Sequence, residues 1–175
     1  MRNDIKISLR EVLKLHEVSD DIHNIIQTQY PKGRIVMSYE KVINYRPTEQ
    51  VAHPKHKPDG FWYGIGTEWI DWVRNNASHW ENEYAFTLDV DWGLMLQIST
   101  YEELVRFTEL YGTSQNGKLS MAQIHWDSVA RDYRGIEIAP YIHKARMEVG
   151  WYYSWDVASG CLWGDNVISD IKKIG

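Results

Sequence analysis

Cysteine, phenylalanine and proline are scarce: the chain has one Cys, three Phe and five Pro in 175 residues. A single cysteine excludes an intramolecular disulfide framework and is typical of a reducing compartment. No run of about 18 apolar residues occurs, and the first residues are charged throughout, so we expect neither a membrane span nor a secretory signal. Lys and Arg number 19 against 24 Asp and Glu, a net charge of −5. This acidic balance argues against a protein that coats nucleic acid nonspecifically. Because we expect no membrane span and no signal, we expect a cytoplasmic protein.

Internal repeats, low-complexity tracts and Gly/Ser linkers are also absent from the sequence. The hydrophobic fraction of 43% and the charged fraction of 25% are ordinary for a globular protein and exclude global disorder. A chain of this length buries about two thirds of its unfolded surface, so it needs no disulfide or structural metal to stabilise the fold. The sequence therefore predicts one domain over residues 1–175, with a helical N-terminal segment at 1–30 and a mixed sheet core at 34–175.

Tryptophan and tyrosine are abundant, with 9 Trp and 11 Tyr. Both side chains combine an apolar ring with a polar atom, which suits half-wet surfaces and the walls of ligand sites. The alternative is that most of these rings fill the core.

Short strands and helices follow one another without a regular period. Apolar alternation and short apolar runs predict strands at 34–44, 61–65, 84–90, 94–98, 135–138, 151–157 and 161–163. Helical spacing predicts helices within 5–30, after Thr67, at 101–111, at 124–133 and at 165–174. The irregular order favours an α+β fold over a doubly wound one.

Local signals sharpen two of these boundaries. Thr100 and Glu103 have the spacing of a capping box, and Gly112 is placed to end the helix that they begin. Asp91-Trp92-Gly93 resembles a tight turn, so we expect the two strands that flank it to form a hairpin.

Common catalytic and metal motifs are missing. His53 and His56 lie among lysines in a proline-rich loop, and with one Cys and no HExxH motif we expect no metal site. Cys161 follows no nucleophile elbow, and a buried, inert thiol is the simpler interpretation. Gly64-Ile65-Gly66 lacks the third glycine of a dinucleotide fingerprint.

Several short motifs, spread over residues 40–165, together resemble a known family. Tyr45-Arg46 ends an early strand, and Lys57-Pro58-Asp59-Gly60-Phe61-Trp62 leads through a strand into a helix. Later come Tyr133-Arg134-Gly135-Ile136 and Trp155-Asp156-Val157-Ala158-Ser159. The "KP-x-G-[LF]-W" and "W-D-V-x-S" segments resemble those of uncharacterised phage and bacterial proteins. The order of the motifs resembles the ADP-ribosyltransferase superfamily.

This resemblance implies a fold and a set of binding residues. The fold would be a split, mostly antiparallel sheet with flanking helices that holds NAD, as a substrate, in a cleft. Arg46 would hold a phosphate or the adenosine ribose, and Tyr45 would help to orient that group. Trp62 or Tyr63 would stack on the nicotinamide. The basic loop 55–57 would meet the pyrophosphate or a nucleic-acid target.

The resemblance also implies a catalytic carboxylate. Such a group would stabilise the oxocarbenium-like state that forms as nicotinamide leaves, the charge problem that a glycosidase also solves. Glu137 is the first candidate and Asp156 the second. The Ser-Thr-Ser patch of the superfamily is absent here, and neither Glu137 nor Asp156 belongs to a Glu-x-Glu pair.

Each of these residues also has a plainer interpretation. Arg46 could form an ordinary ion pair, Glu137 could face solvent, and Asp156 could cap a turn.

At the level of function, the first hypothesis is an ADP-ribosyltransferase-like enzyme that cleaves the nicotinamide–ribose bond and acts on a protein or nucleic-acid target. The alternative is a non-catalytic binding or inhibitor protein, for example phage-encoded, with a Trp/Tyr-rich surface. A third hypothesis is a nucleotide or nucleic-acid module that uses loop 53–57 beside Trp62.

Overall fold

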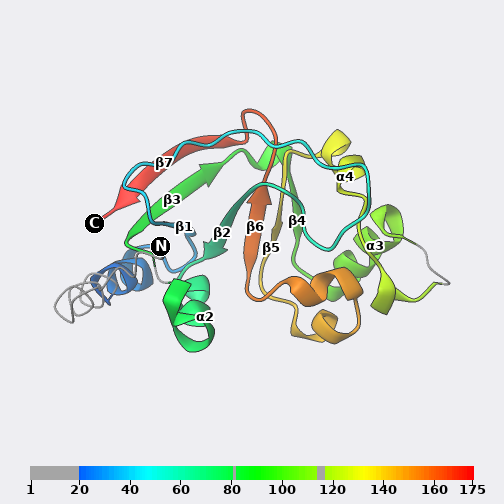
Figure 1. Cartoon of the computed structure of the whole chain (residues 1–175), viewed down its shortest axis with the longest axis horizontal. Coiled ribbons are helices and arrows are strands. Elements are labelled where there is room, and N and C mark those ends of the chain that lie inside the picture. Colours follow the sequence, from blue (N-terminus) through cyan, green and yellow to red (C-terminus); the bar gives the residue numbers. More distant parts are fainter. Residues whose placement is uncertain (1–19, 81, 114–116) are drawn as a thin grey trace, which may run out of the picture.

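A computed structural model describes residues 20–80, 82–113 and 117–175 (Figure 1). Its centre is a curled seven-stranded sheet in the order β4-β5-β6-β2-β1-β3-β7. Every neighbouring pair is antiparallel except β4 and β5, which are parallel. The predicted α+β class and the mostly antiparallel sheet are therefore confirmed.

The strands are β1 (Arg34–Ser38), β2 (Phe61–Ile65), β3 (Tyr84–Val90), β4 (Met95–Ile98), β5 (Gly135–Ile138), β6 (Ser159–Leu162) and β7 (Ile168–Ile174). The α-helices are residues 20–29, α2 (Glu68–Asn76), α3 (Tyr101–Tyr111) and α4 (Trp126–Asp132). Short 3₁₀ helices are η1 (Ser78–Trp80), η2 (Trp92–Leu94), η3 (Leu119–Met121), η4 (His143–Met147) and η5 (Gly150–Ser154). No helix in these described ranges is long and apolar enough to cross a membrane.

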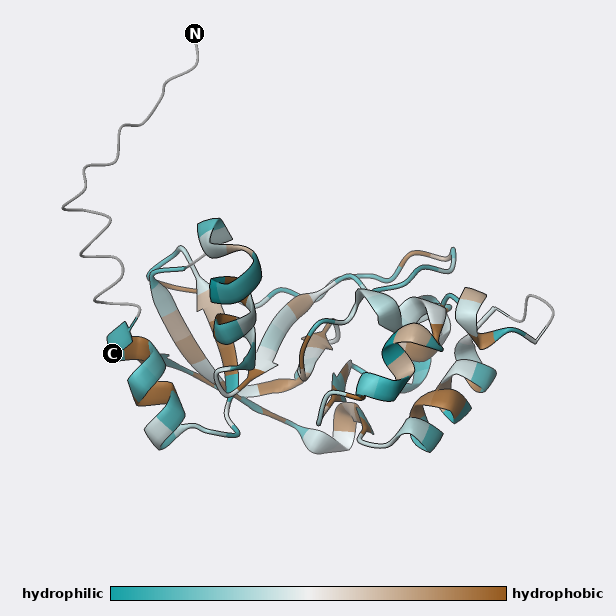
Figure 2. Cartoon of the chain, turned by 90° about the horizontal axis from the view of Figure 1, so that it is seen from below, coloured by the Kyte–Doolittle hydropathy of each residue, from teal (hydrophilic) through white to brown (hydrophobic). Residues whose placement is uncertain are grey.

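One face of the sheet carries two separate groups of helices. Helix 20–29 and α2 pack on β1 and β3 through a cluster that includes Ile26, Ile35, Ile70 and Ala85. At the other end of the sheet, α3, α4, η4 and η5 pack on β4, β5 and β6 around fully buried tryptophans. In Figure 2 the helices alternate between hydrophobic and hydrophilic residues, as amphipathic helices do. The strands between the two groups of helices form the floor of the site described below.

The opposite face has an apolar cluster of its own. Because the sheet curls, side chains from β3, β4 and β6 meet there, among them Leu88, Met95 and Leu162. Ile43 and Tyr45, from the long segment between β1 and β2, pack against the same cluster. This segment contains the proline-rich loop of His53 and His56, and residues 39–60 contain no strand.

Local signals correctly placed several elements. Thr100 Oγ1 accepts a hydrogen bond from the Glu103 backbone N–H, and the Glu103 carboxylate accepts one from the Thr100 N–H, so the capping box is confirmed. Gly112 is the C-cap of α3, as expected. The helix over 20–29 is confirmed, whereas the part predicted before residue 20 lies outside the described residues.

The helix predicted for the C-terminal residues 165–174 is wrong. Residues 165–174 do not form a helix, because β7 pairs with β3 from Ala85↔Ile174 to Val90↔Ile168. This pairing joins segments that lie about eighty residues apart in the sequence. The expected hairpin is also wrong: β3 and β4 do not pair with each other, and η2 redirects the chain between them. The Asp91 carboxylate stabilises η2 by accepting a hydrogen bond from the Gly93 N–H.

The strand predicted for the aromatic segment 151–157 is also wrong. Residues 151–157 were expected to form a strand, yet Gly150–Ser154 form η5. Trp151, Tyr152 and Trp155 are all fully buried. The adjacent Trp151 and Tyr152 are both buried while Tyr153 is 58% exposed, whereas a strand would direct Trp151 and Tyr153 to the same face. The early strand is shorter than expected, since β1 ends at Ser38.

Candidate functional site

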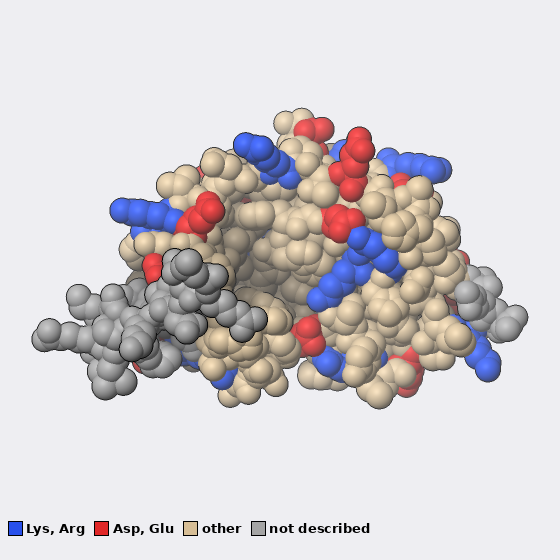
Figure 3. Space-filling view, viewed as in Figure 1, with Lys and Arg blue, Asp and Glu red and all other residues tan. Residues whose placement is uncertain are grey.

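A cleft of about 370 Å³ opens on the helix-bearing face of the sheet, between the two groups of helices. Figure 3 shows this hollow in the middle of the molecule. Strands β1, β2 and β6 form the floor, α2 forms one side, and the segment after η5 forms the other. We call it the central cleft. Its lining residues are Ile35, Met37, Lys57, Trp62, Tyr63, Gly64, Trp69, Asn82, Trp155, Asp156, Val157 and Ser159.

Tryptophans form much of its wall. The rings of Trp62 and Trp155 meet edge to face, with centroids 4.9 Å apart. Trp69 approaches the floor closely because position 64 is glycine: a Cβ there would lie 2.8 Å from the Trp69 Cβ. Trp69 in turn stacks on Trp72, with centroids 5.1 Å apart and planes 9° apart. Such walls suit a flat ring as a ligand.

Lys57 and Asp156 are the charged groups among the described lining residues. The Lys57 ammonium lies 5.1 Å from the centroid of the Trp62 ring. Burial lowers the pKa of Lys57, and the Asp156 carboxylate opposes that shift. Arg146 Nη2 holds Asp156 Oδ1 at 3.3 Å, and Arg146 Nη1 also donates to the Tyr141 hydroxyl at 2.9 Å. The cleft thus contains one cation and one carboxylate that a neighbouring guanidinium positions.

Two buried polar atoms of lining residues have no hydrogen-bond partner among the described residues. They are the indole N–H of Trp155, which belongs to a fully buried side chain, and Oδ1 of Asn82. Leaving such an atom unpaired costs about 1–3 kcal/mol. The residues that line the cleft therefore include one unpaired donor and one unpaired acceptor, both of them buried.

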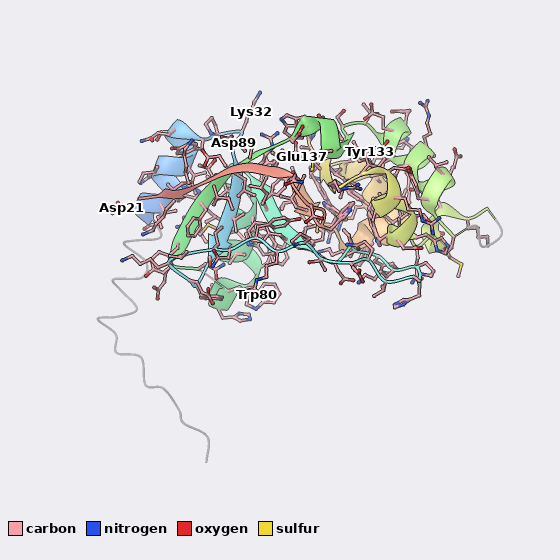
Figure 4. The ribbon with its side chains drawn as sticks, turned by 90° about the horizontal axis from the view of Figure 1, so that it is seen from above. Asp21, Lys32, Trp80, Asp89, Tyr133 and Glu137 are labelled. Carbon is pink, nitrogen blue, oxygen red and sulfur yellow. The ribbon has the colours of Figure 1, made fainter. Side chains whose placement is uncertain are left out.

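Glu137 lies outside this cleft. It is 7% exposed, so the interpretation as a solvent-facing residue is wrong. Arg34 donates from Nε to Oε2 at 2.8 Å and from Nη2 to Oε1 at 3.1 Å, and the Tyr63 hydroxyl donates to Oε2 at 2.9 Å. The alternation of β5 directs Ile136 to the tryptophan cluster and Glu137 to the opposite face. In Figure 4 Glu137 lies far from Trp80 at the end of η1.

Burial and the hydrogen bond to Glu137 together explain the raised pKa of the Tyr63 hydroxyl. Burial, followed by the negative charge of Glu137, raises the pKa of the Tyr63 hydroxyl well above its ordinary value. Arg34 also lies over the Trp92 ring, 4.2 Å from its centroid. Tyr63 borders the cleft, but its hydroxyl is committed to Glu137 on the other face of the sheet. These contacts give Glu137 a structural role.

Tyr45 and Arg46 also lie away from the cleft. The Tyr45 hydroxyl donates to the Gly164 carbonyl at 2.7 Å, and its ring meets Phe61 edge to face. Burial, with smaller contributions from Cys161 and Asp165, raises the pKa of Tyr45 to about 12. Arg46 is exposed in the segment that follows, and neither residue lines the cleft. Of the residues expected from the sequence, the cleft brings together Trp62, Tyr63 and Asp156.

The basic loop divides its side chains between different places. Lys55 pairs with Asp59, and its backbone forms two hydrogen bonds with Ile124. Lys57 enters the central cleft, whereas His56 lines a second groove. Cys161 is fully buried, and burial raises the pKa of its thiol, as expected for an inert cysteine.

Sequence reasoning missed most of the cleft lining, including Trp69, Asn82 and Trp155. Trp69 and Trp155 were assigned to a helix and a strand, and no local pattern distinguishes a ring that borders a cleft from one that fills a core. Asn82 has no signal in the sequence. The described residues hold no group of three or more His, Cys, Asp or Glu side chains that could bind a metal ion.

Comparison with known proteins provides no relative. No protein-family model, no curated protein and no solved structure matches this chain.

Proposed function

We propose that the central cleft binds NAD and that the protein cleaves the nicotinamide–ribose bond, transferring ADP-ribose to a macromolecular target. The observation that carries this proposal is the convergence of Trp62, Lys57 and Asp156 in one cleft whose lining residues include an unpaired donor and an unpaired acceptor. This arrangement supports the function expected from the resemblance, with a revised set of residues.

A nicotinamide group would pair with the two unpaired atoms if the cleft wall moved to expose them. Its carboxamide has one carbonyl acceptor and an NH₂ donor, which complement the Trp155 indole N–H and the Asn82 Oδ1. Its flat ring would lie among the tryptophans, with Trp62 as the stacking partner. A volume of about 370 Å³ is at the lower end of the range for small-molecule sites, about 300–1,000 Å³. The cleft would accordingly enclose the nicotinamide riboside half, while Lys57 meets the pyrophosphate.

Asp156 would supply the carboxylate for the reaction. As the bond between the nicotinamide nitrogen and ribose C1′ breaks, its electron pair leaves with neutral nicotinamide, and positive charge develops on the ribose. A fixed carboxylate stabilises that charge. A nucleophile of the target then bonds to C1′ and loses its proton to Asp156 or to solvent. Arg146 keeps Asp156 in place through the 3.3 Å contact.

The decisive experiment measures nicotinamide release from NAD and, separately, NAD binding by tryptophan fluorescence. We compare the wild type with Asp156→Asn and with Asp89→Asn, which removes an exposed carboxylate on β3. We expect release by the wild type and Asp89→Asn, and binding without release by Asp156→Asn. If the wild type neither binds NAD nor releases nicotinamide, the proposal is wrong.

The second candidate is a non-catalytic binding protein. The observation in its favour is a row of aromatic rings, Trp69, Trp72 and Trp80, that leads from the cleft along α2 to the 48% exposed Trp80. Exposed tryptophans are frequent anchors of interfaces. Capture of a partner by the wild type, but not by Trp80→Ala, in the absence of any NAD turnover would favour this function.

A further inference from the structure

A second groove, of about 270 Å³, lies on the outer side of η3, η4 and η5. Its walls include Met121, Met147 and Tyr153, together with Arg146 from η4 and His56 from the basic loop. We call it the methionine groove. Gly150 allows η5 to approach η3, since a Cβ at that position would lie 2.6 Å from the Ser120 carbonyl oxygen. The groove is thus a product of close backbone packing.

Its apolar side chains are unusually exposed. Met147 is 77% exposed, and Met121 and Tyr153 are each 58% exposed. A single exposed apolar residue is normal, but here three of them line one concave surface. Methionine, tyrosine and arginine are enriched at protein interfaces, and methionine adapts its shape to different side chains. The composition of the groove is therefore that of an interface.

Arg146 is the charged side chain among the described residues that line the groove. No carboxylate belongs to the described lining residues. Lys144, also on η4, lies 3.9 Å from the centroid of the Tyr101 ring. The nearby Glu148 accepts a hydrogen bond from the Tyr101 hydroxyl at 2.5 Å. The two carboxylates near the groove, Asp156 and Glu148, are held by Arg146 and by Tyr101. Arg146 is the cation that an acidic partner would meet at the wall.

Arg146 is held in a fixed position with donors to spare. Its guanidinium donates to the Tyr141 hydroxyl, to the Trp155 carbonyl and to Asp156. These contacts account for three of the five N–H donors of an arginine. The guanidinium carbon lies 5.4 Å from the centroid of the Tyr153 ring, at the wall of the groove. A preordered cation beside an apolar wall binds a carboxylate at a low entropic cost.

We propose that the methionine groove docks an acidic segment of a partner protein, in which a large apolar side chain lies between Asp or Glu residues. The apolar side chain would insert among Met121, Met147 and Tyr153, and a carboxylate would pair with Arg146. The volume of about 270 Å³ is below that of sites for whole small molecules and suits one anchoring side chain. This inference does not rest on NAD chemistry, although Arg146 also holds Asp156 of the central cleft.

The test uses three fluorescein-labelled peptides and the full-length protein. The first peptide, GSEELFEESG, is acidic with an apolar centre; GSKKLFKKSG reverses its charges; GSEEGGEESG removes its apolar centre. Fluorescence anisotropy should show saturable binding of the first peptide alone, weakened by salt. Met147→Glu should reduce its affinity by about tenfold or more, since it places a carboxylate in the groove.

The matched control is Leu110→Glu, which introduces the same charge at a 71% exposed residue of α3 outside the groove. Circular dichroism verifies that both variants fold, which we expect because both positions are exposed. The proposal is overturned if the first peptide shows no saturable binding up to about 1 mM. Equal binding of the lysine peptide, or equal loss in Leu110→Glu, also overturns it. Groove-dependent binding of single-stranded DNA in place of the peptide would identify a nucleic-acid surface instead.

Discussion

Arg34 on β1 donates two hydrogen bonds, of 2.8 Å and 3.1 Å, to Glu137 on β5, across the two strands that lie between them. The residues are 103 positions apart in the sequence. The Tyr63 hydroxyl completes the set from β2. This contact ties the two halves of the sheet together on the face opposite the central cleft.

The first prediction concerns this buried carboxylate. Glu137→Gln removes one charge and leaves the Arg34 guanidinium poorly compensated, so we expect the free energy of unfolding to fall by about 2–3 kcal/mol. The loss is below that of a fully buried pair because the Arg34 side chain is 26% exposed. Urea unfolding measures it. Glu109→Gln, at an exposed position of α3, should change stability by less than about 0.5 kcal/mol.

The same variant separates a structural from a catalytic Glu137. At a temperature where Glu137→Gln remains folded, nicotinamide release per folded molecule should equal that of the wild type. A loss of activity without a loss of stability would return Glu137 to the catalytic role that the sequence suggested.

The fold could be predicted where local signals decide the structure. The capping box at Thr100, the stop at Gly112 and the apolar runs of β2 and β3 depend on neighbouring residues. The register of β7 on β3 depends on residues far apart in the sequence, and it turned an expected helix into a strand. The aromatic segment at 151–157 has no alternation that would distinguish a buried 3₁₀ helix from a buried strand.

The residues of the site likewise divide into those that local motifs predict and those that long-range strand pairing decides. Trp62 and Asp156 were both chosen from short motifs, and the pairing of β2 with β6 brings them into one cleft. Glu137 was chosen from a similar motif, but the register of β5 directs it to Arg34. A single sequence contains no information on which face of a fully buried strand bears the cleft, since β5 is buried on both faces.

The second prediction uses the lowered pKa of Lys57. Between that pKa and 10.5, the unfolded chain binds more protons at this position than the folded protein, so this group makes the folded state more stable as pH rises. Binding of an anionic ligand changes in the opposite direction, because the ammonium is lost over the same window. NAD affinity measured by fluorescence should therefore fall as pH rises toward 10.5.

Conservative variants test the assignment to Lys57. Lys57→Arg should keep its NAD affinity over this window, because a guanidinium stays protonated. Lys172→Arg, on the exposed part of β7, should leave the wild-type profile unchanged. An unaltered pH profile in Lys57→Arg would mean that another group titrates.

The third prediction concerns the contact between the floor and the wall of the cleft. Gly64→Ala places a Cβ 2.8 Å from the Trp69 Cβ, and α2 must shift to accommodate it. We expect a loss of about 1–3 kcal/mol in stability and weaker NAD binding, measured by urea unfolding and by fluorescence. Gly93→Ala is the milder control, because its nearest atom is an Asp91 carboxylate oxygen at 3.2 Å. Equal effects in both variants would contradict the packing argument.

The last prediction compares two tryptophans of one buried cluster. Trp151 and Trp155 are both fully buried, but the indole N–H of Trp151 donates to Thr108 Oγ1 at 2.9 Å, whereas that of Trp155 has no partner among the described residues. Replacement by Phe removes similar volume from both, and only Trp151→Phe also breaks a hydrogen bond. Trp151→Phe should therefore be less stable than Trp155→Phe by about 1–2 kcal/mol in urea unfolding. For NAD binding the order reverses: Trp155→Phe should lose about fivefold or more in affinity, because it removes the donor proposed for the carboxamide. Equal NAD affinities in the two variants would remove Trp155 from the proposed site.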